Sequence, residues 1–252
     1  MERIDHNIFR IKVPFEDVYT TVFIIKTEVG TMIFDTATYD SDVDKYILPA
    51  IEEAGVKNDI KYIFLSHSHK DHSGGTERLL QTFPDACVLT RSQKLADNYK
   101  TAYMPNDREA VLDVLEVVTI KGHSDDCMAI FDRRSGTLLT GDCLQLYGLF
   151  GRDEWGSNIT DIIGHFDDIE KLKTIDIKTL IASHDYHPLG YIARGDEVIK
   201  YLDTCKESLY KLRDFCNAHK ELDDEQLKEL FNSTHKLPRV SLGVFKAIKK
   251  EL

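Results

Sequence analysis

Short apolar runs alternate with amphipathic segments along most of the chain, which is the pattern of a layered α/β fold. Strands are predicted over residues 8–13, 20–26, 31–36, 60–65, 87–89, 115–120, 128–131, 137–140 and 179–182. Helices are predicted over 41–54, 76–83, 92–99 and 162–173; the first has an N-cap and acidic first turn, and a proline follows the second.

The composition changes after residue 192. Apolar side chains then recur at helical spacing on one face, at Val198, Leu202, Cys205, Leu209, Leu212 and Phe215, which predicts the last core helix. Two shorter helices are predicted over 222–231 and 244–252. We therefore expect a core over residues 1–220 and a helical extension over 221–252 packed on it. Covering the site and supporting a homodimer are the alternative roles of this extension.

Four side chains that commonly bind metals, His67, His69, Asp71 and His72, directly follow the predicted strand 60–65. A lone histidine is most often a surface or core-edge residue, but four ligand types in the order H-x-H-x-D-H after a strand predict a metal site. Imidazole and carboxylate suit zinc and other first-row divalent ions. Because the Asp-His pair is expected to diverge from the first two histidines, two neighbouring ions are the economical arrangement.

This motif, followed by Ser-Gly-Gly, resembles the signature of the metallo-β-lactamase superfamily. The resemblance extends over about residues 7–190, because Gly122-His123-Ser124, Thr140-Gly141-Asp142 and Ala182-Ser183-His184-Asp185 occur in the family's order. It implies an α/β fold of the αβ/βα sandwich type, with two mixed β-sheets flanked by helices.

The resemblance also implies a set of seven metal ligands. His67, His69 and His123 would hold one ion, Asp71, His72 and His184 would hold the other, and Asp142 would bridge them. Asp35 matches an aspartate that supports the ligands in this family, although a turn-capping role is equally consistent with its position. Zinc is the expected ion, with iron and manganese as alternatives, since mixed His and carboxylate sites accept all three. The family's third-His turn often continues Pro-Gly, whereas this chain has Asp125-Asp126-Cys127, which leaves the shape of that loop open.

The function implied by the resemblance is a dinuclear metal-dependent hydrolase, in which a metal-bridging hydroxide attacks the carbonyl of a small ester, lactone or thioester. Asp71 would orient the hydroxide proton. The Ser-His-Asp at 183–185 is similar to the lactonase branch, and glyoxalase II-like enzymes are further relatives of this type. The alternatives are a phosphodiesterase with the same two metals and an inactive metal-binding or ligand-sensing module. A flavodiiron oxidoreductase is disfavoured because His69 stands where those relatives have Glu.

The segment 144–158 leaves the predicted sheet directly after Asp142 and combines glycines with large aromatic residues. This composition is typical of a ligand-binding wall, so we predict that Tyr147, Phe150 and Trp155 line the substrate pocket. Tyr147 is the candidate catalytic residue in this segment, because its hydroxyl can bond a substrate oxygen. Packing under the sheet is the alternative role, and His187 is expected to be peripheral.

Whole-chain properties fit an ordinary globular protein of 252 residues, with 42% hydrophobic and 30% charged residues. The net charge of −11 argues against a nucleic-acid partner, which needs a basic face, and favours a small-molecule substrate. The start of the chain is charged and no long apolar run occurs, so neither a secretory signal nor membrane insertion is expected. Five cysteines without a C-x-x-C pair favour a reducing, cytoplasmic location.

Overall fold

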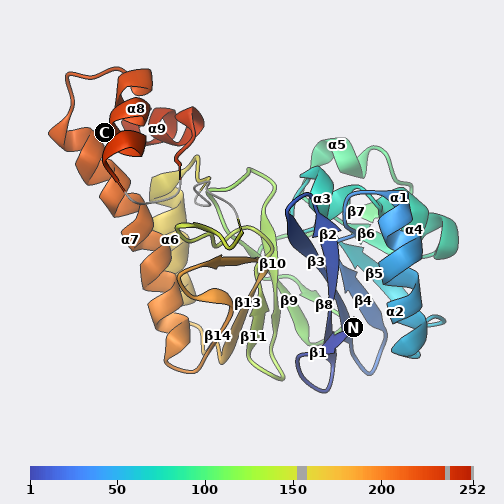
Figure 1. Ribbon diagram of the computed structural model, residues 1–252. Helices are drawn as coiled ribbons and strands as arrows, with labels where there is room; N and C mark the ends of the chain where they lie inside the picture. Colours follow the sequence, from blue (N-terminus) through green and yellow to red (C-terminus); the bar gives the residue numbers. More distant parts are fainter. Residues whose placement is uncertain (152–157, 236–238, 251–252) are drawn as a thin grey trace. The chain divides into compact units, whose positions relative to one another are not determined.

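The computed structural model describes residues 1–151, 158–235 and 239–250. The chain divides into two compact units (Figure 1). Unit 1 contains Met1–Thr119 and Asp126–Arg134, and unit 2 contains Ile120–Asp125 and Ser135–Leu252.

Unit 1 is organised around a seven-stranded sheet whose order follows the sequence. Its strands are β1 (Glu2–Arg3), β2 (Ile8–Phe15), β3 (Val18–Lys26), β4 (Thr31–Phe34), β5 (Ile60–Phe64), β6 (Cys87–Leu89) and β7 (Ala102–Tyr103). The strands from β1 to β4 pair antiparallel, and those from β4 to β7 pair parallel. Unit 1 also contains β8 (Ala110–Val111), β9 (Leu115–Thr119) and β10 (Met128–Asp132), which pair antiparallel in sequence order.

The helices of unit 1 are α1 (Asp40–Asp42), the π-helical turn η1 (Val43–Ile47), α2 (Leu48–Glu53), α3 (Lys70–Ser73), α4 (Thr76–Thr82) and α5 (Gln93–Ala96). Figure 1 shows α1, α2 and α4 along one face of the first sheet. Strand residues such as Ile24 and Ile63 form a common core with Ile47, Ile51 and Leu79 from these helices. Alternate residues of β2 and β3, such as Val13 and Val22, belong to the same core, so burial of apolar area holds the helices on the sheet.

The predicted helix 41–54 is present, but it is interrupted by the π-helical turn η1. The backbone N–H of Leu48 bonds to the carbonyl of Val43, five residues earlier. Pro49 follows directly, and its nitrogen carries no hydrogen to donate to the preceding turn. The π-helical turn η1 therefore lies directly before Pro49, where the regular helical hydrogen-bond pattern is interrupted in any case.

Unit 2 contains β11 (Thr137–Leu139), β12 (Gly148–Leu149), β13 (Thr179–His187) and β14 (Gly190–Arg194). Strand β13 pairs parallel with β11 and antiparallel with β12 and β14. Its register is irregular between Ile181 and Tyr186. The sequence predicted that this strand ends at Ala182; instead it continues to His187, so His184 lies within the strand and not after it.

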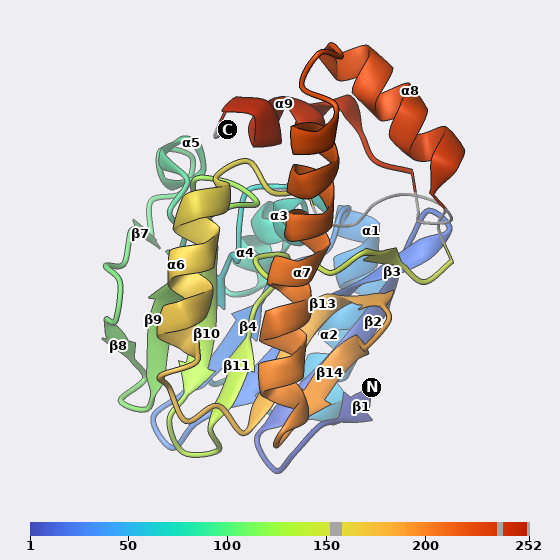
Figure 2. The ribbon, with the colours of Figure 1, turned by 90° about the vertical axis from the view of Figure 1, so that its left-hand side faces the viewer.

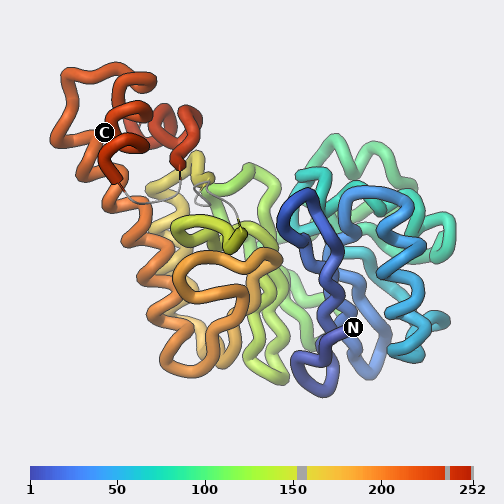
Figure 3. The backbone as a smooth tube through the Cα atoms, in the orientation of Figure 1, coloured from blue at the N-terminus to red at the C-terminus, as the bar shows by residue number. Residues whose placement is uncertain are grey.

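The helices among the described residues of unit 2 are α6 (Ile162–Leu172), α7 (Glu197–Ala218), α8 (Asp224–Thr234) and α9 (Leu242–Lys250). Figure 2 shows α6 and α7 side by side. The tube in Figure 3 leads from α7 into α8 and α9 at the C-terminal end. Leu212, Phe231 and Phe245, one from each of α7, α8 and α9, belong to one buried cluster. The predicted domain boundary at residue 220 stays a prediction.

In the second sheet, the strands of unit 2 follow the order β12-β13-β11, with β14 paired to β13, and those of unit 1 follow the order β10-β9-β8. Both sheets contain parallel and antiparallel pairs, which confirms the predicted class of two mixed β-sheets flanked by helices. Within the residues described, no helix is long and apolar enough to cross a bilayer. The expected cytoplasmic location and the homodimer stay predictions.

Candidate metal centre

In unit 1, the four predicted ligands follow the carboxyl end of β5. The backbone leaves the sheet after Leu65, whose N–H still bonds to Leu89 beside it at 2.9 Å. His69 has an extended backbone and is the N-cap of α3, and Asp71 and His72 lie on this helix. No helix was predicted over these four residues, which follow the predicted strand 60–65. The short helix turns the chain back, so His72 is buried like His67, while His69 is exposed and Asp71 is partly buried.

Asp35, at the end of β4, holds two positions of this segment. Its Oδ1 accepts a hydrogen bond from the Ser66 backbone N–H at 2.7 Å, and its Oδ2 accepts one from Ser66 Oγ at 2.9 Å. Oδ2 also lies 2.7 Å from His72 Nδ1. Asp35 is fully buried, and desolvation raises the pKa of its carboxyl, while the contact with His72 opposes this rise.

These contacts define the tautomers of two histidines. A carboxylate only accepts, so Nδ1 of His72 donates to Asp35 and its Nε2 carries the lone pair. Ser66 Oγ donates to Asp35, and its oxygen therefore accepts from Nδ1 of His67 at 3.1 Å. His67 likewise presents Nε2 as the unprotonated nitrogen. An imidazole whose other nitrogen donates to an acceptor is the usual form of a metal-ligating histidine.

The two glycines after His72 permit a close approach of two backbones. A Cβ on Gly74 would overlap the carbonyl of Thr38, and one on Gly75 would overlap the carbonyl of Thr36. The Thr36 backbone N–H in turn donates to the carbonyl of His72 at 2.8 Å. The segment that follows Asp35 is thus bonded directly to the helix that carries His72.

In unit 2, Asp142 lies between two imidazoles. Its Oδ1 is 3.4 Å from Nε2 of His184, and its Oδ2 is 4.0 Å from Nε2 of His123. All three side chains are buried. Nδ1 of His123 lies 3.1 Å from the carbonyl oxygen of Asn158, and because a carbonyl only accepts, Nε2 again carries the lone pair. Each oxygen of Asp142 therefore faces a different histidine.

Gln145 connects two parts of this arrangement and was missed by the sequence reasoning. Its Oε1 accepts from the backbone N–H of Asn158 at 2.8 Å, so its Nε2 faces Asp142 Oδ2 at 3.4 Å. Asn158 is the residue whose carbonyl contacts His123. A glutamine three residues after a predicted ligand is common in any loop, and no sequence signal marks it.

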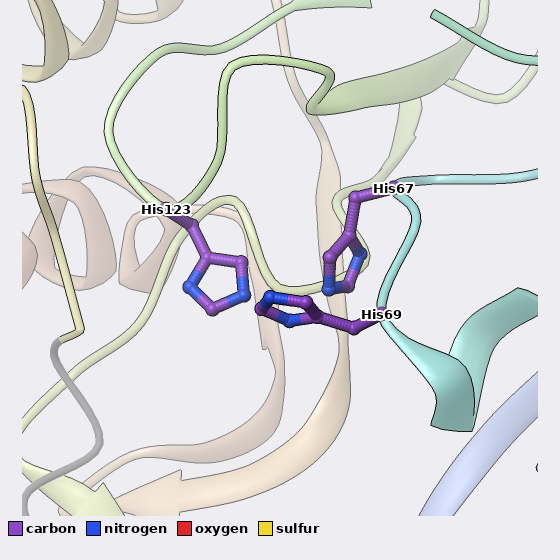
Figure 4. Close-up of side chains that lie close together, drawn as sticks. All are labelled: His67, His69 and His123. Atoms are coloured by element: carbon purple, nitrogen blue, oxygen red, sulfur yellow. The ribbon is translucent and has the colours of Figure 1, made fainter. Parts of the chain in front are cut away.

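Three groups of side chains bring potential ligand atoms within 4.8 Å of one another. They are His67, His69 and His123; His67, His72 and Asp142; and Asp71, His72 and His184. Figure 4 shows the three imidazole rings of the first group lying close together. The groups together contain all seven predicted ligands, and nitrogen and carboxylate oxygen donors of this kind suit zinc. Ion binding by these residues stays a prediction.

The predicted pocket wall is partly described. Tyr147 is buried in the cluster formed with α7, α8 and α9, and its hydroxyl accepts a hydrogen bond from Lys211 Nζ at 2.7 Å. Phe150 is 42% exposed, and the centroid of its ring lies 3.6 Å from that of the His187 ring. Trp155 lies outside the described residues. The catalytic role of Tyr147 and the substrate contacts of Phe150 and Trp155 stay predictions.

Comparisons with known proteins agree with this picture. Residues 16–184 match the family model of the metallo-β-lactamase superfamily. A hydroxyacylglutathione hydrolase of Nostoc sp. is 28% identical over 168 residues, covering 61% of this chain and 63% of that protein. An atrochrysone carboxyl ACP thioesterase of Emericella nidulans is 25% identical over 186 residues, covering 71% of this chain and 52% of that protein. The chain spans between 52% and 66% of the length of the first curated relatives.

Similarity to solved structures concerns the fold. A metallo-β-lactamase family protein from Thermus thermophilus superposes with a TM-score of 0.68 at 17% identity, covering 99% of this chain and 93% of that one. The family model covers more than half of the chain and includes all seven predicted ligands. This chain belongs to the metallo-β-lactamase superfamily.

Proposed function

We propose that this chain is a metal-dependent hydrolase with a dinuclear centre, acting on the carbonyl of a small thioester or ester. The observation that carries the proposal is Asp142, whose two oxygens face His184 at 3.4 Å and His123 at 4.0 Å. A carboxylate with each oxygen turned to a different imidazole is suited to bridge two ions, one beside each histidine. The three groups of ligand atoms support the same arrangement.

The residues present fit two divalent ions. The donors are imidazole nitrogens and carboxylate oxygens, and the contacts of Asp35, Ser66 and Asn158 leave Nε2 as the ligand atom of His67, His72 and His123. Ions bound there would lower the pKa of a water toward about 7 and polarise a substrate carbonyl. The expected ion is zinc, with iron and manganese as the alternatives.

The chain's own groups then orient the substrate and its protons. Asp71 Oδ2 lies 3.2 Å from Nε2 of His72, so its carboxylate is close enough to the ligand atoms to hold a proton of the attacking water. Tyr147, whose hydroxyl oxygen accepts a hydrogen bond from Lys211, is the proposed hydrogen-bonding group for a substrate oxygen. The same hydrogen bond, with Glu207 beside it, raises the pKa of Lys211 and keeps it protonated.

The relatives favour a thioester over other carbonyl substrates. One similar protein is named a thioesterase and another a hydroxyacylglutathione hydrolase. The net charge of −11 is further support for a small molecule rather than a nucleic acid as the substrate.

Metal analysis combined with a substrate panel tests the proposal. The purified protein should hold two equivalents of a divalent ion and hydrolyse members of a panel of thioesters, esters, lactones and phosphodiesters, with thioesters fastest. His69→Gln should lose metal and activity, whereas the matched change His6→Gln, at an exposed histidine in the loop after β1, should retain both.

Three outcomes would contradict the proposal. Full activity after removal of metal by a chelator would show that no ion is needed. Preferential cleavage of phosphodiesters would replace carbonyl hydrolysis with the phosphodiesterase alternative. Tight metal binding without turnover on any member of the panel would favour a sensing role.

A further inference from the structure

The backbone just before His123 is held by helix α6 and the residues that lead into it. The N–H of Lys121 donates to Asp168 Oδ2 at 2.9 Å, and the carbonyl of Lys121 accepts from His165 Nδ1 at 2.7 Å. The carbonyl of Gly122 accepts from both the backbone N–H and the hydroxyl of Thr160, at 2.6 and 2.9 Å. Both polar backbone atoms of Lys121 and the carbonyl of Gly122 are thus fixed by one stretch of the chain.

Helix α6 is built to present these side chains together. Asp161 caps its start by accepting from the N–H of Gly164 at 2.9 Å. His165 and Asp168 are three residues apart, so they lie on the same face of the helix. Both are buried, and Asp168 Oδ1 is further held by Lys171 Nζ at 2.8 Å.

His165 has features that packing alone does not require. Because its Nδ1 donates to a carbonyl, Nε2 is unprotonated, and this buried nitrogen has no hydrogen-bond partner among the residues that the structure describes. Burial lowers the pKa of His165 to about 4, so the ring is neutral near pH 7. An apolar side chain would fill this space without leaving a buried acceptor unbonded. Histidine differs from an apolar residue at this position because it can donate a hydrogen bond to the carbonyl of Lys121.

The turn itself needs an external restraint. Gly122 has φ of +124°, a region that residues with a side chain rarely adopt, and residues 120–127 contain no proline. A Cβ at Gly122 would lie 3.0 Å from His165 Nδ1 and 3.1 Å from its Cβ, so the ring packs directly on this glycine. The next residue is His123.

We propose that His165 and Asp168 are positioning residues for the metal ligand His123. They hold the N–H and the carbonyl of Lys121, and with Thr160 they fix the path of the backbone into His123. This inference rests on the proposed metal centre and adds the element of the chain that orients one of its ligands. It predicts that substitutions in α6 change the affinity for the ion beside His123 more than the affinity for the ion beside His72.

A metal titration of matched variants tests the inference. His165→Leu removes the donor, and His165→Asn retains a donor near the place of Nδ1. Competition against a chromophoric zinc chelator gives the two affinities, and the visible spectrum of the cobalt(II) protein reports the geometry around each ion. His165→Leu should lower the affinity for one of the two ions by about tenfold to a hundredfold, as is usual when a group that orients a ligand is lost.

The variants separate positioning from stability. His165→Asn should bind this ion with an affinity within about threefold of wild type. Asp168→Ala should lower the affinity for the same ion that His165→Leu affects. Asp167→Ala, an exposed change on the same helix, should leave both affinities unchanged. If His165→Leu does not fold, the comparison of Asp168→Ala with Asp167→Ala carries the test.

Two results would overturn the inference while the proposed function stands. In the first, the wild-type protein binds two ions, and the His165→Leu and Asp168→Ala variants bind both ions as tightly as wild type. In the second, the affinities for both ions fall equally and in proportion to the loss of thermal stability. A wild-type protein that binds no ion would overturn the proposed function together with this inference.

Discussion

The carboxylate of Asp35 lies 2.7 Å from Nδ1 of His72, although the two residues are 37 positions apart in the chain. Both side chains are fully buried. The contact selects the tautomer of His72 whose Nε2 can bind a metal, and the same carboxylate holds the backbone at Ser66. A single residue thus orients both the first and the last part of the H-x-H-x-D-H segment.

Asp35→Asn should weaken metal binding about tenfold to a hundredfold with a folded structure retained. Asp35 has φ of +62°, which asparagine also tolerates, so the backbone should not change. Asparagine has one acceptor oxygen in place of two, so it cannot accept from both the Ser66 N–H and Nδ1 of His72, and the arrangement that selects the required tautomer is lost. Zinc affinity measured by chelator competition checks this, with Asp44→Asn at an exposed site as the control. Unchanged affinity would show that His72 does not depend on Asp35.

Asp142→Ala should reduce metal content and activity together, because the proposed bridge between the ions is lost. Asp142→Asn, which keeps one acceptor oxygen, should retain more metal than Asp142→Ala. Metal stoichiometry by elemental analysis and turnover on the best substrate of the panel check both variants. Two tightly bound ions in Asp142→Ala would show that this carboxylate orients other groups and does not bridge.

Tyr147→Phe should lower kcat about tenfold or more while metal content stays at two equivalents, since one hydrogen bond to a substrate oxygen is lost. Lys211→Met should produce a smaller decrease, because it removes only the hydrogen bond to the tyrosine oxygen. Steady-state kinetics and metal analysis separate these effects. An equal loss of stability and activity in both variants would assign Tyr147 to packing against α7 instead.

The metal-free protein should lose stability as the pH falls from 7 to 5, in part because of His165. Burial lowers the pKa of this residue from 6.5 to about 4, so the unfolded chain binds the proton more readily than the folded one. The stability that His165 contributes is therefore present above pH 6.5 and is lost as the pH falls toward 4. Between pH 7 and 5 the loss should be about 2 kcal/mol.

Urea unfolding of the chelator-treated protein at both pH values measures this effect. His165→Asn does not titrate in this range and should show a decrease in unfolding free energy that is smaller by about 2 kcal/mol. Other buried groups are the same in both proteins, so the difference isolates His165. Identical pH dependence in the two proteins would show that the folded protein accommodates the protonated ring.

The sequence predicted features that depend on local patterns. Apolar alternation located β2, and the short apolar run before His67 located β5. The helix α3 was missed because its four residues are too short to show a helical period. Strand β13 was predicted too short, since the polar Ser183, His184 and Asp185 interrupt its apolar run even though the backbone remains extended.

Contacts between distant residues were harder to predict. Lys211 and Tyr147 are 64 positions apart, and a lysine on an amphipathic helix carries no sign of the hydroxyl that it bonds. His165 has the same spacing as the apolar residues of α6, so the apolar pattern gives no indication of its hydrogen bond to Lys121. The family motif identified the proposed ligands because their order along the chain is itself the signal, whereas the groups that orient them have no fixed spacing.

The glycine pair at 74 and 75 limits how this segment can vary. Neither residue offers a donor atom, yet any side chain at either position would separate the backbone of Thr36–Thr38 from the helix that carries His72. Asp35 is the residue just before that backbone, so the separation would also move its carboxylate away from the imidazole. A library of substitutions should therefore tolerate the exposed Ser68 and Lys70 inside the motif while rejecting alanine at both glycines, and inactive variants would map onto two residues that touch neither ion nor substrate.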